Sequence, residues 1–139
     1  MPTVLNPYLN FNGNTAQAMK FYQSVLGGEL KMQTFAEAKM SRSAADANLI
    51  VHASLQNDRL TFFASDTQPN MPATFGNNVH MSITGTDLPA VTAIFNGLSN
   101  GGRVTMPLAK QFWGDTFGML TDKFGVNWML DVMSGQSQM

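Results

Sequence analysis

Histidine has the widest chemical range of the residues in this chain, and it occurs twice, as His52 and His80. An imidazole can carry a proton near neutral pH or bind a metal ion. Cysteine is absent, which excludes disulfides, thiolate catalysis and cysteine-ligated zinc. The glutamates Glu29 and Glu37 lie outside the strands predicted for the histidines. Each histidine is therefore a proton carrier, a metal ligand or a hydrogen-bonded side chain of a sheet.

No established catalytic motif accompanies the histidines. The sequence contains no Ser-His-Asp set with supporting motifs, no phosphate-binding loop, no HExxH and no calcium loop. Eight basic and nine acidic residues give a net charge of −1, so we expect no nucleic-acid partner. The apolar runs are too short to cross a membrane, and the first residues do not form a signal peptide. We therefore expect a cytoplasmic protein with no membrane partner.

The first half of the chain contains a predicted strand, helix, strand and hairpin, which span residues 4–11, 15–26, 30–35 and 49–65. Asn14 is the expected cap of the helix, and Gly27-Gly28 is its expected end. The strand contains Pro7, which lacks an N–H and therefore predicts an edge position.

The second half repeats this order. A strand is predicted over residues 79–84, a helix between the Asp87 cap and Asn100, a strand over 103–107 and a hairpin over 117–132. The halves align without gaps over the first strand and helix, so that Gly101-Gly102 matches the earlier glycine pair and His80 matches Asn6. Each half therefore reads β-α-β-β-β, which predicts an α+β protein. We expect a single domain of residues 1–139, with module 1 at about 1–66, a linker at about 67–77 and module 2 at about 78–133.

Three motifs carry a family resemblance: PYLNF followed by AMKFYQSVLGGEL, then VHASL, then FWGDTFGMLTDKFGVNWML, within residues 7–30, 51–55 and 112–130. The chain resembles the vicinal oxygen chelate superfamily of glyoxalase I, extradiol dioxygenases and bleomycin- and fosfomycin-resistance proteins. Within it, the chain is most similar to the phosphonate-operon B-type (PhnB-like) branch. The resemblance covers nearly the whole chain. It implies two tandem βαβββ modules that form a curved eight-stranded mixed sheet around a cleft, and it implies a homodimer.

The resemblance also implies where a metal would bind, because metal-using members place ligands on the first and last strand of each module. These positions hold Asn6, His80 and, approximately, Phe62 and Met129. Only His80 is a good ligand for zinc, nickel or iron. We therefore expect no tightly held cofactor. A divalent metal, if one is present, would use His80 and Asp131.

Strand parity places further candidates in the cleft, because alternate side chains of a strand point to opposite faces. Tyr8 and Asn10 share parity with Asn6, and His52 belongs to the polar face of its strand. The two asparagines could instead satisfy backbone groups at a strand edge. Trp113 borders the cleft, or it packs in the core or in a dimer interface. The predicted ligand-binding set is Asn6, Tyr8, Asn10, His52, Phe62, His80, Trp113 and Met129.

Three functions are compatible with these residues. The first is the binding of a small organic molecule in the cleft, which requires no metal. The second is a metal-dependent lyase, isomerase or dioxygenase in which His80 is a ligand and His52 carries protons. The third is a scaffold whose dimer surface is its function. The sequence leaves open whether any reaction is catalysed, and His80 and His52 are the catalytic candidates.

Overall fold

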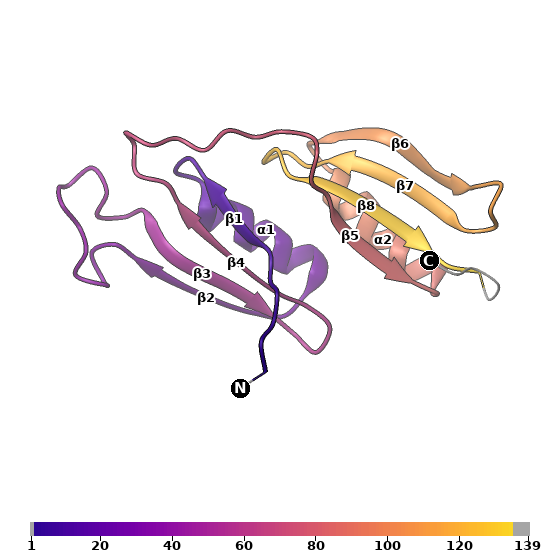
Figure 1. The fold of residues 1–139 in the computed structure, drawn as a ribbon, viewed down its shortest axis with the longest axis horizontal. Helices are drawn as coiled ribbons and strands as arrows, with labels where there is room; N and C mark the ends of the chain where they lie inside the picture. Colours follow the sequence, from indigo (N-terminus) through magenta and orange to yellow (C-terminus); the bar gives the residue numbers. More distant parts are fainter. Residues whose placement is uncertain (1, 135–139) are drawn as a thin grey trace. The chain divides into compact units, whose positions relative to one another are not determined.

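A computed structural model describes residues 2–134 of this 139-residue chain. The chain divides into two compact units, Met1–Thr74 and Phe75–Met139, and the boundary falls within the predicted linker. Each unit has one helix packed on one face of a four-stranded sheet (Figure 1). Neither helix of the described part of the chain has the length and apolar character that a membrane span requires.

The first unit has a mixed sheet in which the first and last strands are neighbours. Its elements are β1 (Tyr8–Phe11), α1 (Thr15–Leu26), β2 (Glu29–Thr34), β3 (Ile50–Gln56) and β4 (Thr61–Asp66). The strand order is β1-β4-β3-β2, with β1 and β4 parallel and the other pairs antiparallel. Met19 and Tyr22 of α1 are buried against Leu55 and Phe62 of the sheet, because these apolar side chains share the inner layer.

The second unit repeats this architecture. Its elements are β5 (Met81–Gly85), α2 (Leu88–Ser99), β6 (Arg103–Lys110), β7 (Thr116–Thr121) and β8 (Asn127–Val132), in the sheet order β5-β8-β7-β6. The carboxylate of Asp87 accepts a hydrogen bond from the Ala90 amide at 3.1 Å, which confirms the predicted cap of α2. Val91, Phe95 and Leu98 recur at helical spacing and are buried.

The α+β class and the two βαβββ modules are confirmed. The eight strands, however, form two four-stranded sheets rather than the one eight-stranded sheet that was predicted, because each sheet is paired entirely within its own unit among the described residues. The first strand of each unit is also shorter than predicted. β1 begins at Tyr8, after Pro7, and β5 begins at Met81, so His80 precedes its strand.

A carboxylate at the end of β4 connects that strand to the turn between β1 and α1 and to the start of β3. Asp66 is 5% exposed, and its Oδ1 accepts hydrogen bonds from the Gly13 amide at 3.0 Å, the Thr15 amide at 3.0 Å and the Thr15 hydroxyl at 2.7 Å. Its Oδ2 accepts the Ile50 amide at 2.8 Å. The predicted cap was wrong, because the Asn14 side chain makes no capping hydrogen bond. Asp66 supplies that cap from a distant part of the sequence.

A second buried carboxylate orders the β7–β8 turn. Asp122 accepts hydrogen bonds from the Phe124 amide at 2.8 Å and the Val126 amide at 3.1 Å. Its other oxygen accepts the indole N–H of Trp128 at 2.8 Å. Asp122 is therefore the turn residue that the sequence indicated, and it also provides the polar partner that the buried Trp128 requires.

Replacing Asp66 with Ala should destabilise the protein by at least about 3 kcal/mol, because three buried donors, the Thr15 amide, the Thr15 hydroxyl and the Ile50 amide, lose their acceptor and each unsatisfied donor costs roughly 1–3 kcal/mol. Urea unfolding followed by circular dichroism measures this loss. The matched control is Asp58→Ala, which removes an exposed aspartate of the same unit and should change the free energy of unfolding by less than about 0.5 kcal/mol. Equal effects of the two substitutions would contradict the role given to Asp66.

Candidate functional site

The face of the first sheet that is turned away from α1 carries an aromatic cluster of Tyr8, His52 and Phe63. Their ring centroids are separated by 6.4 Å for Tyr8 and His52, 6.2 Å for Tyr8 and Phe63, and 5.5 Å for His52 and Phe63. Tyr8 is 49% exposed, His52 is exposed and Phe63 is half-buried. We call this surface the aromatic face. It presents rings rather than a saturated apolar surface, and it is accessible within its unit.

Strand pairing explains why these three rings meet. Tyr8 lies opposite Phe63 in the parallel β1–β4 ladder, and Phe63 lies opposite Ser54 in the antiparallel β3–β4 ladder. His52 shares parity with Ser54 and is therefore on the same face, one row along. The cluster thus depends on three strands that are held in one register.

Polar side chains surround the aromatic face. The Ser65 hydroxyl donates to Asn10 Oδ1 at 3.2 Å, and Gln33 of the edge strand β2 lies opposite His52. Lys31 lies opposite Ser54, but it is exposed and its ammonium lies 3.8 Å from the Glu29 carboxylate. The face therefore combines aromatic surface with hydroxyl and amide groups and has little net charge.

Phe62 does not belong to this face. It is 3% exposed and lies on the helix side of the sheet, with its ring 5.9 Å from that of Tyr22. Tyr8 and Ser82 occupy equivalent positions in the two units, 74 residues apart. Tyr8 pairs with Phe63 and Ser82 pairs with Met129, so the residue of the first unit that is equivalent to Met129 is Phe63. Sequence reasoning missed Phe63 because two adjacent phenylalanines occupy β4, and only the strand partners decide which one points outward.

Asn6 has a structural contact. It precedes β1, and its side-chain amide donates to the Thr61 carbonyl at 3.2 Å. This bond ties the segment before β1 to β4. It corresponds to the alternative reading, in which the asparagine satisfies a backbone group near a strand edge.

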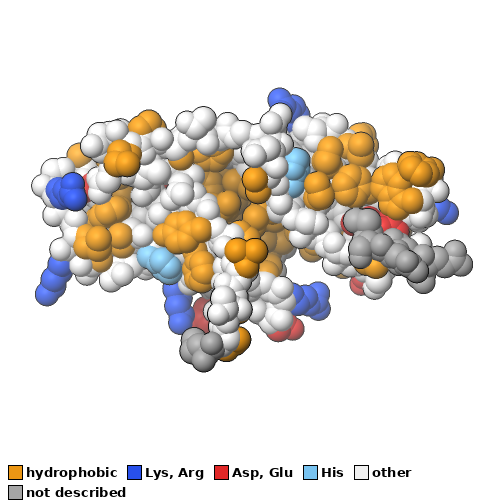
Figure 2. Space-filling model, viewed as in Figure 1, with side chains coloured by type: hydrophobic (Ala, Val, Ile, Leu, Met, Phe, Trp, Pro, Cys, Tyr) orange, Lys and Arg blue, Asp and Glu red, His pale blue; other side chains and the backbone are white. Residues whose placement is uncertain are grey.

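The second unit carries different chemistry at the corresponding positions. Met129 is half-buried opposite Ser82, and His80 is half-buried just before β5. Trp113 is 42% exposed in the loop before β7, with its ring centroid 6.0 Å from that of Phe117 and 4.9 Å from that of Phe112. Imidazole surface is visible among hydrophobic side chains in Figure 2. The predicted residues thus fall into two groups, one in each unit.

A model of the glyoxalase/bleomycin resistance protein/dioxygenase superfamily matches residues 4–130. The chain belongs to this superfamily. The Escherichia coli K12 protein YjdN is 30% identical over 144 residues, which cover 95% of this chain and 97% of YjdN.

Two solved structures extend this relationship. PA1353 from Pseudomonas aeruginosa superposes with a TM-score of 0.83 at 37% identity, over 94% of this chain and 97% of that protein. A Bacillus cereus PhnB protein, described as a putative 3-demethylubiquinone-9 3-methyltransferase, superposes with a TM-score of 0.78 at 25% identity, over 92% and 98% of the two chains. The glyoxalase-like fold and the PhnB-like resemblance are therefore confirmed.

The metal site implied for this superfamily does not fit the residues present. Asp131 lies opposite Thr84, and His80 is four residues before Thr84 on the same chain segment. At about 3.3 Å per residue this separation is roughly 13 Å, too far for one ion to bind both side chains. Among residues 2–134, no three His, Asp or Glu side chains come together to hold a metal. We therefore derive no metal-dependent step for His80 or Asp131.

Asp131 is instead part of a buried acidic pair with Asp115. Asp131 is 1% exposed and Asp115 is fully buried. Burial, followed by the neighbouring Asp115 carboxyl, raises the pKa of Asp131 to about 6. Neither residue was predicted to form such a pair, because the sequence gives no signal that an aspartate of a loop and an aspartate of a strand lie close together.

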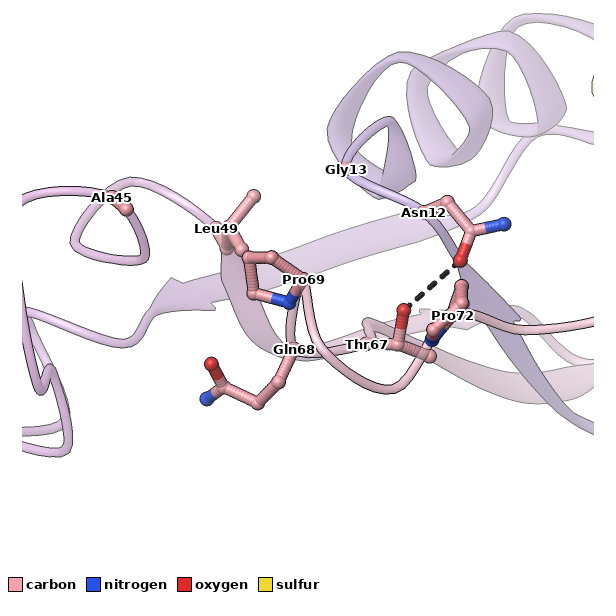
Figure 3. Close-up of a pocket in the computed structure, with 8 residues that line it drawn as sticks. All are labelled: Asn12, Gly13, Ala45, Leu49, Thr67, Gln68, Pro69 and Pro72. Carbon is pink, nitrogen blue, oxygen red and sulfur yellow. Dashed lines mark hydrogen bonds between the residues drawn. The ribbon is translucent and has the colours of Figure 1, made fainter.

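Two open hollows, one in each unit, lie away from the predicted site residues. In the first unit, a hollow of about 250 Å³ is lined by Asn12, Gly13, Ala45, Leu49, Thr67, Gln68, Pro69 and Pro72 (Figure 3). The Thr67 hydroxyl donates to Asn12 Oδ1 at 3.0 Å across its wall. In the second unit, a groove of about 450 Å³ runs between α2 and β6. Neither hollow is lined by a predicted site residue.

Divalent metals should not stabilise this protein. A metal bound at 100 times its dissociation constant would add about 2.7 kcal/mol, which scanning calorimetry detects as a rise of several degrees in Tm. We expect the same Tm with about 0.1 mM zinc, nickel or manganese as with EDTA. The His80→Ala variant tests the one good donor, and His52→Ala is its matched control. A metal-dependent rise that only His80→Ala abolishes would restore the metal-dependent reading.

Proposed function

We propose that this protein binds a small organic molecule with a planar aromatic ring on the aromatic face of its first sheet, without a tightly held metal. The observation that carries the proposal is the grouping of Tyr8, His52 and Phe63 within 6.4 Å of one another on a face that α1 leaves uncovered. A large exposed aromatic surface is costly in water unless a partner covers it. A ring that stacks on this surface removes that cost.

The ring geometry favours an aromatic ligand over an aliphatic one. Tyr8 and His52 meet edge to face at 62°, and Phe63 is tilted by 41° to Tyr8 and by 39° to His52. The three rings are therefore inclined to one another, so a flat ligand can stack face to face on one ring and edge to face on another. Such contacts contribute about 0.5–1.5 kcal/mol each beyond the area they bury.

The polar neighbours fix the orientation of the ligand. Ser54 and Gln33 lie beside the rings on the same face, and the imidazole of His52 can donate or accept a hydrogen bond. Lys31 is paired with Glu29 at the edge strand, so the face has no unpaired charge to demand a strongly ionic ligand. We therefore propose a neutral or weakly charged aromatic compound with hydroxyl or carbonyl substituents.

A matched pair of compounds tests the class of ligand. Isothermal titration calorimetry with 2-naphthol and with its saturated analogue decahydro-2-naphthol compares an aromatic and an aliphatic ring system of the same skeleton. We expect 2-naphthol to bind at least tenfold more tightly. Equal affinities would contradict the proposal that this face prefers aromatic ligands.

Variants test the location. Tyr8→Leu, His52→Leu and Phe63→Leu keep an apolar side chain but remove a ring, and each should weaken 2-naphthol binding about two- to tenfold. Phe21→Leu is the control, since it removes a ring from α1 on the other layer of the same unit. Unchanged affinity in all three face variants would place the ligand elsewhere.

We also propose that the protein is a homodimer, as the superfamily resemblance implies. Light scattering at micromolar concentration tests this state. A monomer would contradict it without affecting the calorimetric test of the aromatic face.

A further inference from the structure

Three methionines form one row across the uncovered face of the second sheet. Met106 lies opposite Met119 in the β6–β7 ladder, and Met119 lies opposite Met129 in the β7–β8 ladder. Residues directly opposite each other in paired strands share a face, so the three side chains stand next to one another on β6, β7 and β8. We call these residues the methionine row. It belongs to the second unit and is not part of the aromatic face.

The methionine row faces away from helix α2. A Cβ at Gly118 would lie 2.8 Å from Cε2 of Phe95 in α2, so Gly118 faces the helix. Met119, the next residue of β7, therefore faces the opposite side. Met106 is 36% exposed, and Met119 and Met129 are half-buried. The thioethers are thus partly accessible on the surface of their unit.

The fold does not require sulfur at these positions. In the first unit, the equivalent row pairs Lys31 with Ser54 and Ser54 with Phe63, and none of these residues carries sulfur. Met19 of the same unit is fully buried in the core, where a methionine fills irregular space. The methionine row is therefore a feature of the uncovered face of the second sheet rather than of the βαβββ plan or of core packing.

The spacing of the row suits a soft metal ion. A thioether is a neutral, polarisable donor that selects ions such as Cu(I). An ion held about 2.3 Å from each sulfur, as in zinc–sulfur bonds, needs sulfurs roughly 4–4.6 Å apart. Neighbouring strands are about 4.8 Å apart, so two adjacent methionines reach this separation with small side-chain adjustments. The three rotatable bonds of methionine allow a third sulfur to approach the same ion.

We propose that Met106, Met119 and Met129 bind one Cu(I) ion, or its redox-stable analogue Ag(I), through their thioether sulfurs. Met119 is the central ligand, because it neighbours both of the others, whereas each outer methionine neighbours only Met119. Three neutral ligands on an open face hold an exchangeable ion. Zinc, nickel and manganese are bound by imidazole, thiolate or carboxylate groups, which the row lacks, so the expectation for divalent metals is unchanged.

Binding to thioethers should not depend on pH, because a thioether has no proton to lose before it binds an ion. An imidazole ligand of ordinary pKa, about 6.5, would instead bind roughly 20-fold more weakly at pH 5 than at pH 7. We expect the affinity for Ag(I), measured by isothermal titration calorimetry, to change less than about twofold between these values. A loss near 20-fold would assign the ion to a histidine and overturn the methionine row.

NMR of protein labelled with methyl-carbon-13 methionine, titrated with silver nitrate in chloride-free buffer, tests the location. We expect the methyl signals of Met106, Met119 and Met129 to shift together and to saturate at one equivalent. Met71, which is 70% exposed in the first unit, should not shift at that ratio. Shifts of Met71 equal to those of the row would show adventitious binding to any exposed methionine and would refute the site.

Leucine variants test the ligands, because leucine keeps the apolar volume of methionine and the exchange is well tolerated. Met119→Leu removes the central sulfur and should weaken Ag(I) binding at least about tenfold, since the chelate is lost. Met106→Leu leaves the adjacent pair of Met119 and Met129 and should weaken binding about two- to fivefold. Met71→Leu is the matched control and should bind as the native chain. Native affinity in Met119→Leu would overturn the proposal.

Met129→Leu is the second test if Met119→Leu does not fold. It removes a sulfur adjacent to Met119, so it should also weaken Ag(I) binding, and native affinity would again overturn the site. Competition with a colorimetric Cu(I) chelator, in the presence of ascorbate and without oxygen, tests the copper assignment. The native chain should withdraw copper from the chelator and Met119→Leu should not. Equal withdrawal by the two proteins would contradict a Cu(I) site in the row.

Discussion

The parallel pairing of the first and last strands in each unit is the constraint on which the other features depend. It places Tyr8 opposite Phe63 in one sheet and Ser82 opposite Met129 in the other. A slip of one residue would turn Phe62 outward and bury Phe63, because strand side chains alternate between faces. Asp66 is the last residue of β4, and it fastens that strand to the β1–α1 turn and to the start of β3. The buried carboxylate thus secures the register that creates the aromatic face.

The two units share a backbone plan but differ in the chemistry of their uncovered faces. When the strand pairings of the two units are compared, His52 occupies the position equivalent to Phe117, and Ser65 occupies the position equivalent to Asp131. The first unit therefore offers rings surrounded by amides and hydroxyls, whereas the second offers a thioether, an indole and a buried acid pair. The duplicated fold therefore carries different side chains at equivalent positions of its two units.

Much of the fold was predictable because its signals are local. The amphipathic stripe of α2 and its Asp87 cap lie within a few residues of each other, and the repeat of glycine pairs after each helix revealed the duplication. The features that sequence reasoning missed are all long-range. Asp66 caps α1 across 51 residues of sequence, and only the strand partners separate Phe63 from Phe62.

The candidate site shows the same division. Parity placed Tyr8 and His52 on one face, and the structure brings them together. Parity could not show that His80, which precedes β5, lies far from Asp131, because that distance depends on the β5–β8 register. The pairing of Asp115 with Asp131 was equally hidden, since it joins a loop residue to a strand residue through tertiary packing.

The most direct test of the account is an isotope-filtered NOE experiment on the labelled protein with bound 2-naphthol. The account predicts contacts from the naphthol ring protons to the side chains of Tyr8, His52 and Phe63. Contacts to Leu49, Pro69 and Pro72 in the hollow of the first unit, or to Trp113 and Phe117 alone, would contradict it.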